Sequence, residues 1–156
     1  MKFIVIGIII ALAIFYFTRS ANNKKLALEN IAIANTFLTK NKVNEGVQET
    51  ASGLQYLELK KGAGSSHPTA KSTVKVHYHG TLLDGSVFDS SVERDKPISF
   101  PLNQVISGWT EGLQLMVVGD KFRFYIPAHL AYGNRATGSI QPGSLLIFEV
   151  ELLEIQ

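Results

Sequence analysis

T-V-K-V-H-Y-H-G-T-L, residues 73–82, alternates apolar and polar side chains and thereby predicts a β-strand. Because successive side chains of a strand point to opposite faces, Val74, Val76 and Tyr78 share one face of this stretch. The lysine and the two histidines between them share the other face. The stretch is therefore typical of a strand that has one face packed on a core.

The sequence around this strand repeats the pattern and adds one helix. Residues 54–59, 121–126 and 145–153 are strand-like, and Asp84-Gly85 is typical of a hairpin turn. Between residues 107 and 117, apolar side chains recur at the spacing of an α-helix. Strands and helices do not alternate regularly. We therefore predict an α+β fold with a largely antiparallel sheet whose apolar face packs on this helix.

The N-terminal region contains an unbroken apolar run of 15 residues, Phe3 to Phe17. As a helix it would span about 22 Å, which is short of a hydrocarbon core of roughly 30 Å unless flanking residues extend it. A signal peptide needs small residues before its cleavage site, and Thr18 and Ser20 form a poor pair because Arg19 separates them. We expect residues 1–21 to form an uncleaved signal anchor or transmembrane segment, and a cleaved signal peptide is the alternative.

Residues 22–48 are predicted to form an amphipathic linker helix. Apolar residues such as Leu26, Ile31 and Phe37 recur there at roughly helical spacing, between charged residues. The simplest role for this helix is a spacer before the main domain, residues 49–156. The alternative is a homodimer interface through residues 22–44, or an arm that cradles substrate.

Composition and missing motifs exclude several classes of function. The net charge is only +2, and no basic patch contains aromatic residues, so we expect no nucleic-acid partner. The absence of cysteine removes disulfides, thiol nucleophiles and thiolate metal sites. The chain has no serine-hydrolase, phosphate-loop or zinc-protease motif. His77 and His79 lack a neighbouring carboxylate or third histidine in the sequence, so we predict no metal site.

Aromatic residues are concentrated between Tyr78 and Phe148. Phe122 and Phe124 fit the core of a small β-domain, because they alternate on the inner face of their strand. The remaining rings lie at the ends of elements or next to turns, where they can wall an open pocket. They are Tyr78, Phe88, Phe100, Trp109, Tyr132 and Phe148.

Five motifs in this order make residues 51–156 resemble the FKBP family of peptidyl-prolyl cis-trans isomerases. They are V-H-Y-H-G-T-L (76–82), D-G-S-V-F-D-S-S (84–91), F-P-L-N-Q-V-I-S-G-W-T-E-G-L (100–113), A-Y-G (131–133) and L-I-F-E-V-E-L-L (146–153). S-G-L-Q-Y (52–56) is similar to the lead-in of bacterial envelope members. The resemblance implies an antiparallel sheet of five to six strands curled around one short α-helix.

The resemblance also implies a site. Trp109 would form the floor of the pocket, and the Tyr132 hydroxyl would donate a hydrogen bond to a ligand carbonyl. Whether Asp89 acts on the carbonyl carbon or fixes the pocket stays open. The catalytic set is Tyr78, Asp89 and Tyr132, and the substrate-binding set is Phe88, Phe100, Val105, Ile106, Trp109, Ile140 and Phe148.

The expected function is isomerisation of X-Pro bonds, which assists protein folding in proline-containing polypeptides. No covalent bond is broken, so neither a nucleophile, a metal nor a cofactor is required. Macrolide inhibitors are a further implied ligand, although Ile98 and the loop 134–139 depart from the family at the pocket rim. The alternative is a chaperone or scaffold that holds proline segments with little turnover. The expected location is the bacterial cell envelope, with a single inner-membrane span and the domain in the periplasm.

Overall fold

The structure, a computed structural model, describes the backbone of residues 2–156 and the side chains of residues 8–156. A long helix α1 (Lys2–Asn41) precedes the strands β1 (Val47–Glu49), β2 (Gln55–Lys60), β3 (Thr73–Thr81), β4 (Val87–Ser90) and β5 (Ile98–Pro101). A 3-10 helix η1 (Leu102–Gln104) then leads into α2 (Ser107–Leu113). The chain ends with β6 (Lys121–Ile126), the 3-10 helix η2 (Ala128–Leu130) and β7 (Leu146–Ile155).

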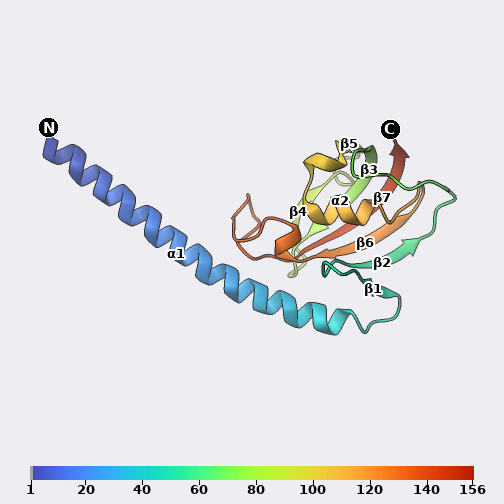
Figure 1. Cartoon of the computed structure of the whole chain (residues 1–156), viewed down its shortest axis with the longest axis horizontal. Helices are drawn as coiled ribbons and strands as arrows, with labels where there is room; N and C mark the ends of the chain where they lie inside the picture. The colour runs from blue at the N-terminus through green and yellow to red at the C-terminus, as the bar shows by residue number, and fades with distance from the viewer. Residues whose placement is uncertain (1) are drawn as a thin grey trace.

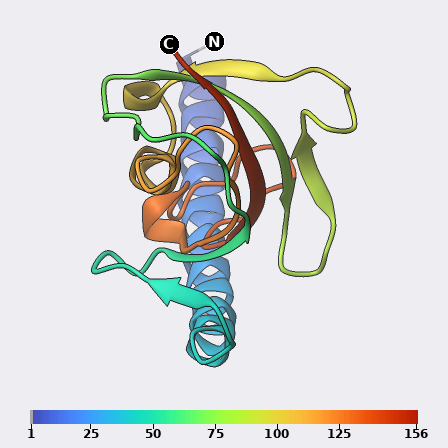
Figure 2. The same ribbon diagram turned by 90° about the vertical axis from the view of Figure 1, so that its right-hand side faces the viewer.

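The strands form one curved sheet in which every pairing is antiparallel. Their order is β1-β2-β6-β7-β3-β4, and β5 pairs with the first half of β3. Helix α2 lies in the hollow of the sheet (Figures 1 and 2). The predicted antiparallel sheet with one short helix is confirmed. The sheet has seven strands where five to six were expected, because β1 and β5 are too short to show a periodic pattern.

Two glycines bring α2 close to the sheet. A Cβ at Gly108 would lie 2.5 Å from Cγ2 of Ile126, and a Cβ at Gly112 would lie 2.7 Å from Cε1 of Phe124. Glycine at both positions therefore lets the helix backbone rest directly on β6. This contact fixes Trp109, which lies between the two glycines in the sequence, against the core.

Helix α1 is continuous from Lys2 to Asn41, where the sequence predicted an anchor followed by a separate linker helix. Its last turns pack on the outer face of the sheet, where Ala34 and Leu38 contact Tyr125. A buried polar contact holds the end of the helix, because Nδ2 of Asn41 donates to Oε1 of Gln55 over 2.9 Å. The C-terminal half of α1 is thus part of the fold, whereas its N-terminal end extends far from the sheet (Figure 1).

The predicted anchor, residues 1–21, lies partly outside the side chains that the structure describes. The large apolar side chains between Ile8 and Phe17 are between 53% and 69% exposed. Within the described part of the chain, no helix combines the length and the apolarity that a membrane crossing needs. The predicted transmembrane segment therefore finds no support in the described residues.

Candidate functional site

One pocket of about 590 Å³ opens between α2 and the hollow of the sheet, a volume typical of ligand sites. It brings together all ten residues that the sequence predicted for the site, although their individual roles stay predictions. They are Tyr78, Phe88, Asp89, Phe100, Val105, Ile106, Trp109, Tyr132, Ile140 and Phe148. The sequence reasoning missed four further lining residues, which are Gln104, Thr137, Gly138 and Ser139.

Trp109 lies at the centre of an aromatic cluster and is only 4% exposed. Its ring is 5.2 Å from that of Tyr78, 5.4 Å from that of Phe100 and 5.3 Å from that of Phe148, measured between centroids. The interplanar angles of these pairs are between 75° and 90°. Such edge-to-face contacts are favourable for aromatic pairs, so rings from β3, β5 and β7 lock the indole in place.

The remaining walls come from three different segments. Phe88 of β4 packs edge-on against Phe148, with centroids 5.2 Å apart. Ile106 directly precedes α2, and its carbonyl accepts hydrogen bonds from that helix, whereas its own N–H has no acceptor among the described residues. Tyr132 and Ile140 lie in the loop between η2 and β7. Apolar side chains therefore surround the cavity on several sides, and the polar lining residues lie among them.

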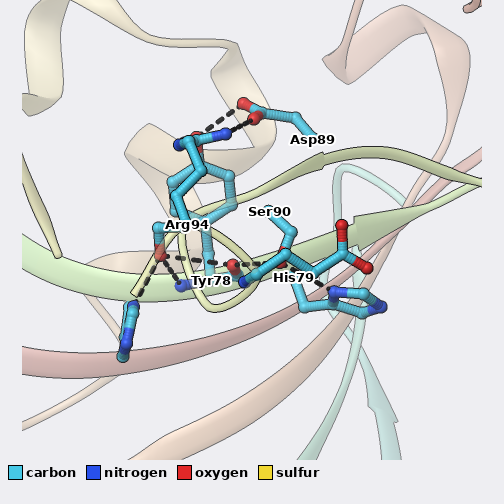
Figure 3. A network of polar contacts seen from close by, with 8 residues as sticks. Tyr78, His79, Asp89, Ser90 and Arg94 are labelled. Atoms are coloured by element: carbon cyan, nitrogen blue, oxygen red, sulfur yellow. Dashed lines mark hydrogen bonds and ion pairs between the residues drawn. The ribbon is translucent and has the colours of Figure 1, made fainter. Parts of the chain in front are cut away.

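The main polar feature of the pocket joins Tyr78, Asp89 and Arg94 (Figure 3). The Tyr78 hydroxyl donates to Oδ2 of Asp89 over 2.5 Å. The guanidinium of Arg94 donates to Oδ1 of Asp89 over 2.5 Å and to the Tyr78 hydroxyl oxygen over 3.1 Å. Arg94 lies in the loop after β4 and belongs to no periodic pattern, so the sequence reasoning did not find it.

This network keeps Asp89 charged. Burial pulls the pKa of Asp89 upward, but the hydrogen bonds from Tyr78 and Arg94 outweigh burial and hold this pKa below its usual range. Burial, together with the neighbouring carboxylate, raises the pKa of the Tyr78 hydroxyl. At neutral pH the pocket therefore contains a carboxylate and a neutral phenol.

The two histidines of β3 lie on the opposite side of the strand from Tyr78. Nδ1 of His77 is 2.7 Å from Oγ of Ser91, and Nδ1 of His79 is 2.9 Å from Oγ of Ser90. The hydroxyl of Ser91 also accepts a 2.8 Å hydrogen bond from the backbone N–H of Tyr78. These serines and histidines therefore tie β3 to the end of β4 and to the residue that follows it, and they do not line the pocket.

The comparisons with known proteins agree with this architecture. A family model described as "FKBP-type peptidyl-prolyl cis-trans isomerase" matches residues 64–153. A second, described as "Domain amino terminal to FKBP-type peptidyl-prolyl isomerase", matches residues 11–57. The crystal structure of FkpA from Escherichia coli has a TM-score of 0.84 and 38% sequence identity, and the match covers 94% of this chain and 71% of that one.

Two curated relatives show the extent of the similarity. The FKBP-type isomerase FkpA of Aeromonas hydrophila is 54% identical over 136 residues, which cover 87% of this chain and 50% of the relative. The outer membrane protein MIP of Legionella longbeachae is 45% identical over 139 residues, which cover 88% of this chain and 59% of the relative. The chain thus spans between half and three fifths of the length of these relatives.

Proposed function

Because this chain belongs to the family of FKBP-type peptidyl-prolyl cis-trans isomerases, we propose that its pocket binds X-Pro segments of polypeptides and accelerates rotation about the X-Pro bond. The observation that carries this proposal is the floor of the pocket, where Trp109 is held edge-on by three other rings. A pyrrolidine ring is apolar and flat enough to lie on such a surface.

Binding in this pocket favours rotation for an electrostatic reason. Resonance in a planar amide gives the C–N bond double-bond character and places negative charge on oxygen and positive charge on nitrogen. A twisted imide has lost this charge separation, so an apolar, water-poor pocket stabilises it relative to the planar state. A rate gain of 10⁴ would need only about 5.5 kcal/mol of such selective stabilisation.

The polar groups of the pocket would orient the peptide. The Tyr132 hydroxyl and the Ile106 backbone N–H are donors to the substrate carbonyls in this proposal. Both carboxylate oxygens of Asp89 accept hydrogen bonds, Oδ2 from the Tyr78 hydroxyl and Oδ1 from the Arg94 guanidinium. These bonds favour a role in fixing the wall of the pocket over direct action on the carbonyl carbon.

A proline-peptide isomerisation assay without a protease tests the proposal. The full chain should accelerate the relaxation of a cis X-Pro peptide, and a macrolide inhibitor should compete with the peptide. Tight peptide binding without acceleration would instead support the alternative function, a chaperone or scaffold that holds proline segments. If the chain neither binds the peptide nor accelerates its isomerisation, both the isomerase and the chaperone function are contradicted.

We also propose that a second copy of this chain is a partner, through residues 22–44 of α1. Leu28 and Ile33 support this, since they are 62% and 57% exposed although the neighbouring Ala27 and Ala34 are buried against the domain. Sedimentation of a chain that begins at residue 22 should give a dimer. A monomer at all accessible concentrations would contradict this proposal.

We propose the bacterial cell envelope as the location, with the domain on the periplasmic side. The exposed apolar side chains between Ile8 and Phe17 support this, because contiguous apolar surface of this kind marks an interaction site or a membrane contact. The name of the Legionella relative, an outer membrane protein, agrees with an envelope location. Protease accessibility in intact cells and spheroplasts, together with N-terminal sequencing, would test both the side and the cleavage of residues 1–21.

A further inference from the structure

The loop between Gly133 and Gly143 forms one wall of the pocket and is held at both ends. Within it, Thr137 and Ile140 exchange two backbone hydrogen bonds of 2.9 Å, which make a narrow turn. The residues 137–140 all line the pocket. Ile140 is 94% buried, although it follows six exposed loop residues, so its position depends on how the loop is held.

A single peptide group joins this loop to α1. The N–H of Gly143 donates to the carbonyl of Gly133 over 2.8 Å and closes the base of the loop. The carbonyl of the same peptide group belongs to Pro142, and it accepts a 2.8 Å hydrogen bond from Nδ2 of Asn30. Asn30 lies 112 positions away in the sequence, on the face of α1 that packs against the domain.

The packing beside this hydrogen bond leaves no free space. Gly143 has a φ of +76°, and a Cβ there would lie 2.3 Å from the carbonyl oxygen of Ala27 and 2.7 Å from its Cα. Ala27 itself is only 1% exposed. Farther along the helix, Asn134 shares a surface pocket with Arg19 and Asn23. Helix α1 therefore contacts the loop near both of its ends, and Figure 1 shows the loop beside α1.

We propose that α1 positions the pocket wall, with Asn30 as the positioning residue that holds Ile140 in place through the Pro142 carbonyl. The inference rests on the proposed function only in that the pocket binds substrate. Without the Asn30 hydrogen bond the loop samples more conformations, and only a fraction of molecules presents a complete pocket. Apparent substrate affinity falls by that fraction, so KM rises while kcat changes little.

The test compares Asn30→Ala, Asn30→Asp and Asn22→Ala in the full chain. Asn22 is an exposed asparagine on the same helix and serves as the matched control. Asn30→Asp keeps the size of the side chain but loses the N–H donor, so it separates the hydrogen bond from packing. Amide hydrogen exchange is followed at Thr137, Ile140 and Gly143, and isomerisation kinetics are measured on a proline peptide.

Both variants at position 30 should speed exchange at these three amides and raise KM by about three- to ten-fold, the effect of losing one hydrogen bond. In these two variants, amide exchange in β3 and β7 should match the wild type. The control Asn22→Ala should match the wild type in both exchange and kinetics. Unchanged loop exchange, or faster exchange with unchanged KM in an active enzyme, would overturn the inference and leave the proposed function intact. A wild-type chain without isomerase activity would overturn the proposed function, and with it the claim on KM, whereas the exchange data would still decide whether Asn30 holds the loop.

Discussion

Gly80 of β3 lies so close to Phe88 that a Cβ at Gly80 would be 2.7 Å from Cζ of that ring. The same Cβ would be 2.9 Å from Cε1 of Phe148. Two pocket rings therefore pack against the Gly80 backbone, where any added Cβ would have to displace them. The glycine of the V-H-Y-H-G-T-L motif thus has a steric role in shaping the pocket.

Gly80→Ala should displace Phe88 and Phe148 and lower kcat/KM by about ten-fold, together with a loss of about 1–3 kcal/mol in the free energy of unfolding, as overpacking typically costs. Thr81→Ala is the control, because the side chain of Thr81 lies on the opposite face of the strand. Isomerisation kinetics and urea denaturation measure the two effects. Wild-type activity in Gly80→Ala would show that the rings can move without consequence.

Tyr78 and Asp89 should act as one unit. We expect Tyr78→Phe and Asp89→Asn each to lower kcat/KM by about ten-fold, because a hydrogen bond to a charged group contributes about 1.5–3 kcal/mol, reduced here by partial exposure. The kcat/KM of the double variant should be little lower than that of the less active single variant, since the two changes remove the same interaction. Additive losses in this double-mutant cycle would mean that the two side chains act independently.

Arg94 should set the lower pH limit of the proposed isomerase activity. The pKa of Asp89 is held below its usual value of about 4, so the contribution of its charged form is complete above that value and is lost as the pH falls through the lowered pKa. Wild-type kcat/KM should therefore be flat from pH 8 down to pH 5. Arg94→Gln removes one of the groups that lower this pKa, so the acid limb of the pH profile should move to higher pH. An unchanged profile would show that Tyr78 alone keeps Asp89 charged.

Periodic patterns gave good predictions wherever one face of a strand meets the core. Phe122 and Phe124 alternate inward in β6 as the sequence predicted, because a two-residue period records which face is buried. Tyr125 of the same strand is also buried, and no local pattern could predict this, since α1 covers the outer face from a distant part of the sequence. The contact of Asn30 with the Pro142 carbonyl arises in the same way, from chain segments that only the tertiary fold brings together. Arg94 is only five residues from Asp89, and its contact depends on the shape of the turn after β4, which no periodic pattern records.

Trp109 should contribute to stability and binding through its ring, and its N–H should matter little. Its Nε1 is buried without a hydrogen-bond partner among the described residues, so Trp109→Phe loses ring area but no hydrogen bond. We expect Trp109→Ala to cost about 3–5 kcal/mol in unfolding free energy and to abolish measurable activity. Trp109→Phe should keep the fold with a smaller loss of unfolding free energy, and it should retain part of the activity. Urea midpoints and kcat/KM for the two variants measure this order, and equal destabilisation by both would contradict it.

Ser91 should be important for stability although it lies outside the pocket. Its side chain is fully buried, and its hydroxyl accepts the hydrogen bond of the Tyr78 backbone N–H while contacting His77. Ser91→Ala would leave that buried N–H without an acceptor, which costs about 1–3 kcal/mol. Ser99→Ala, at an exposed position of β5, is the matched control and should change stability by less than about 0.5 kcal/mol. Thermal and urea unfolding give the comparison. If Ser91→Ala unfolds like Ser99→Ala, the hydrogen bond to Tyr78 does not support the strand that carries the pocket tyrosine.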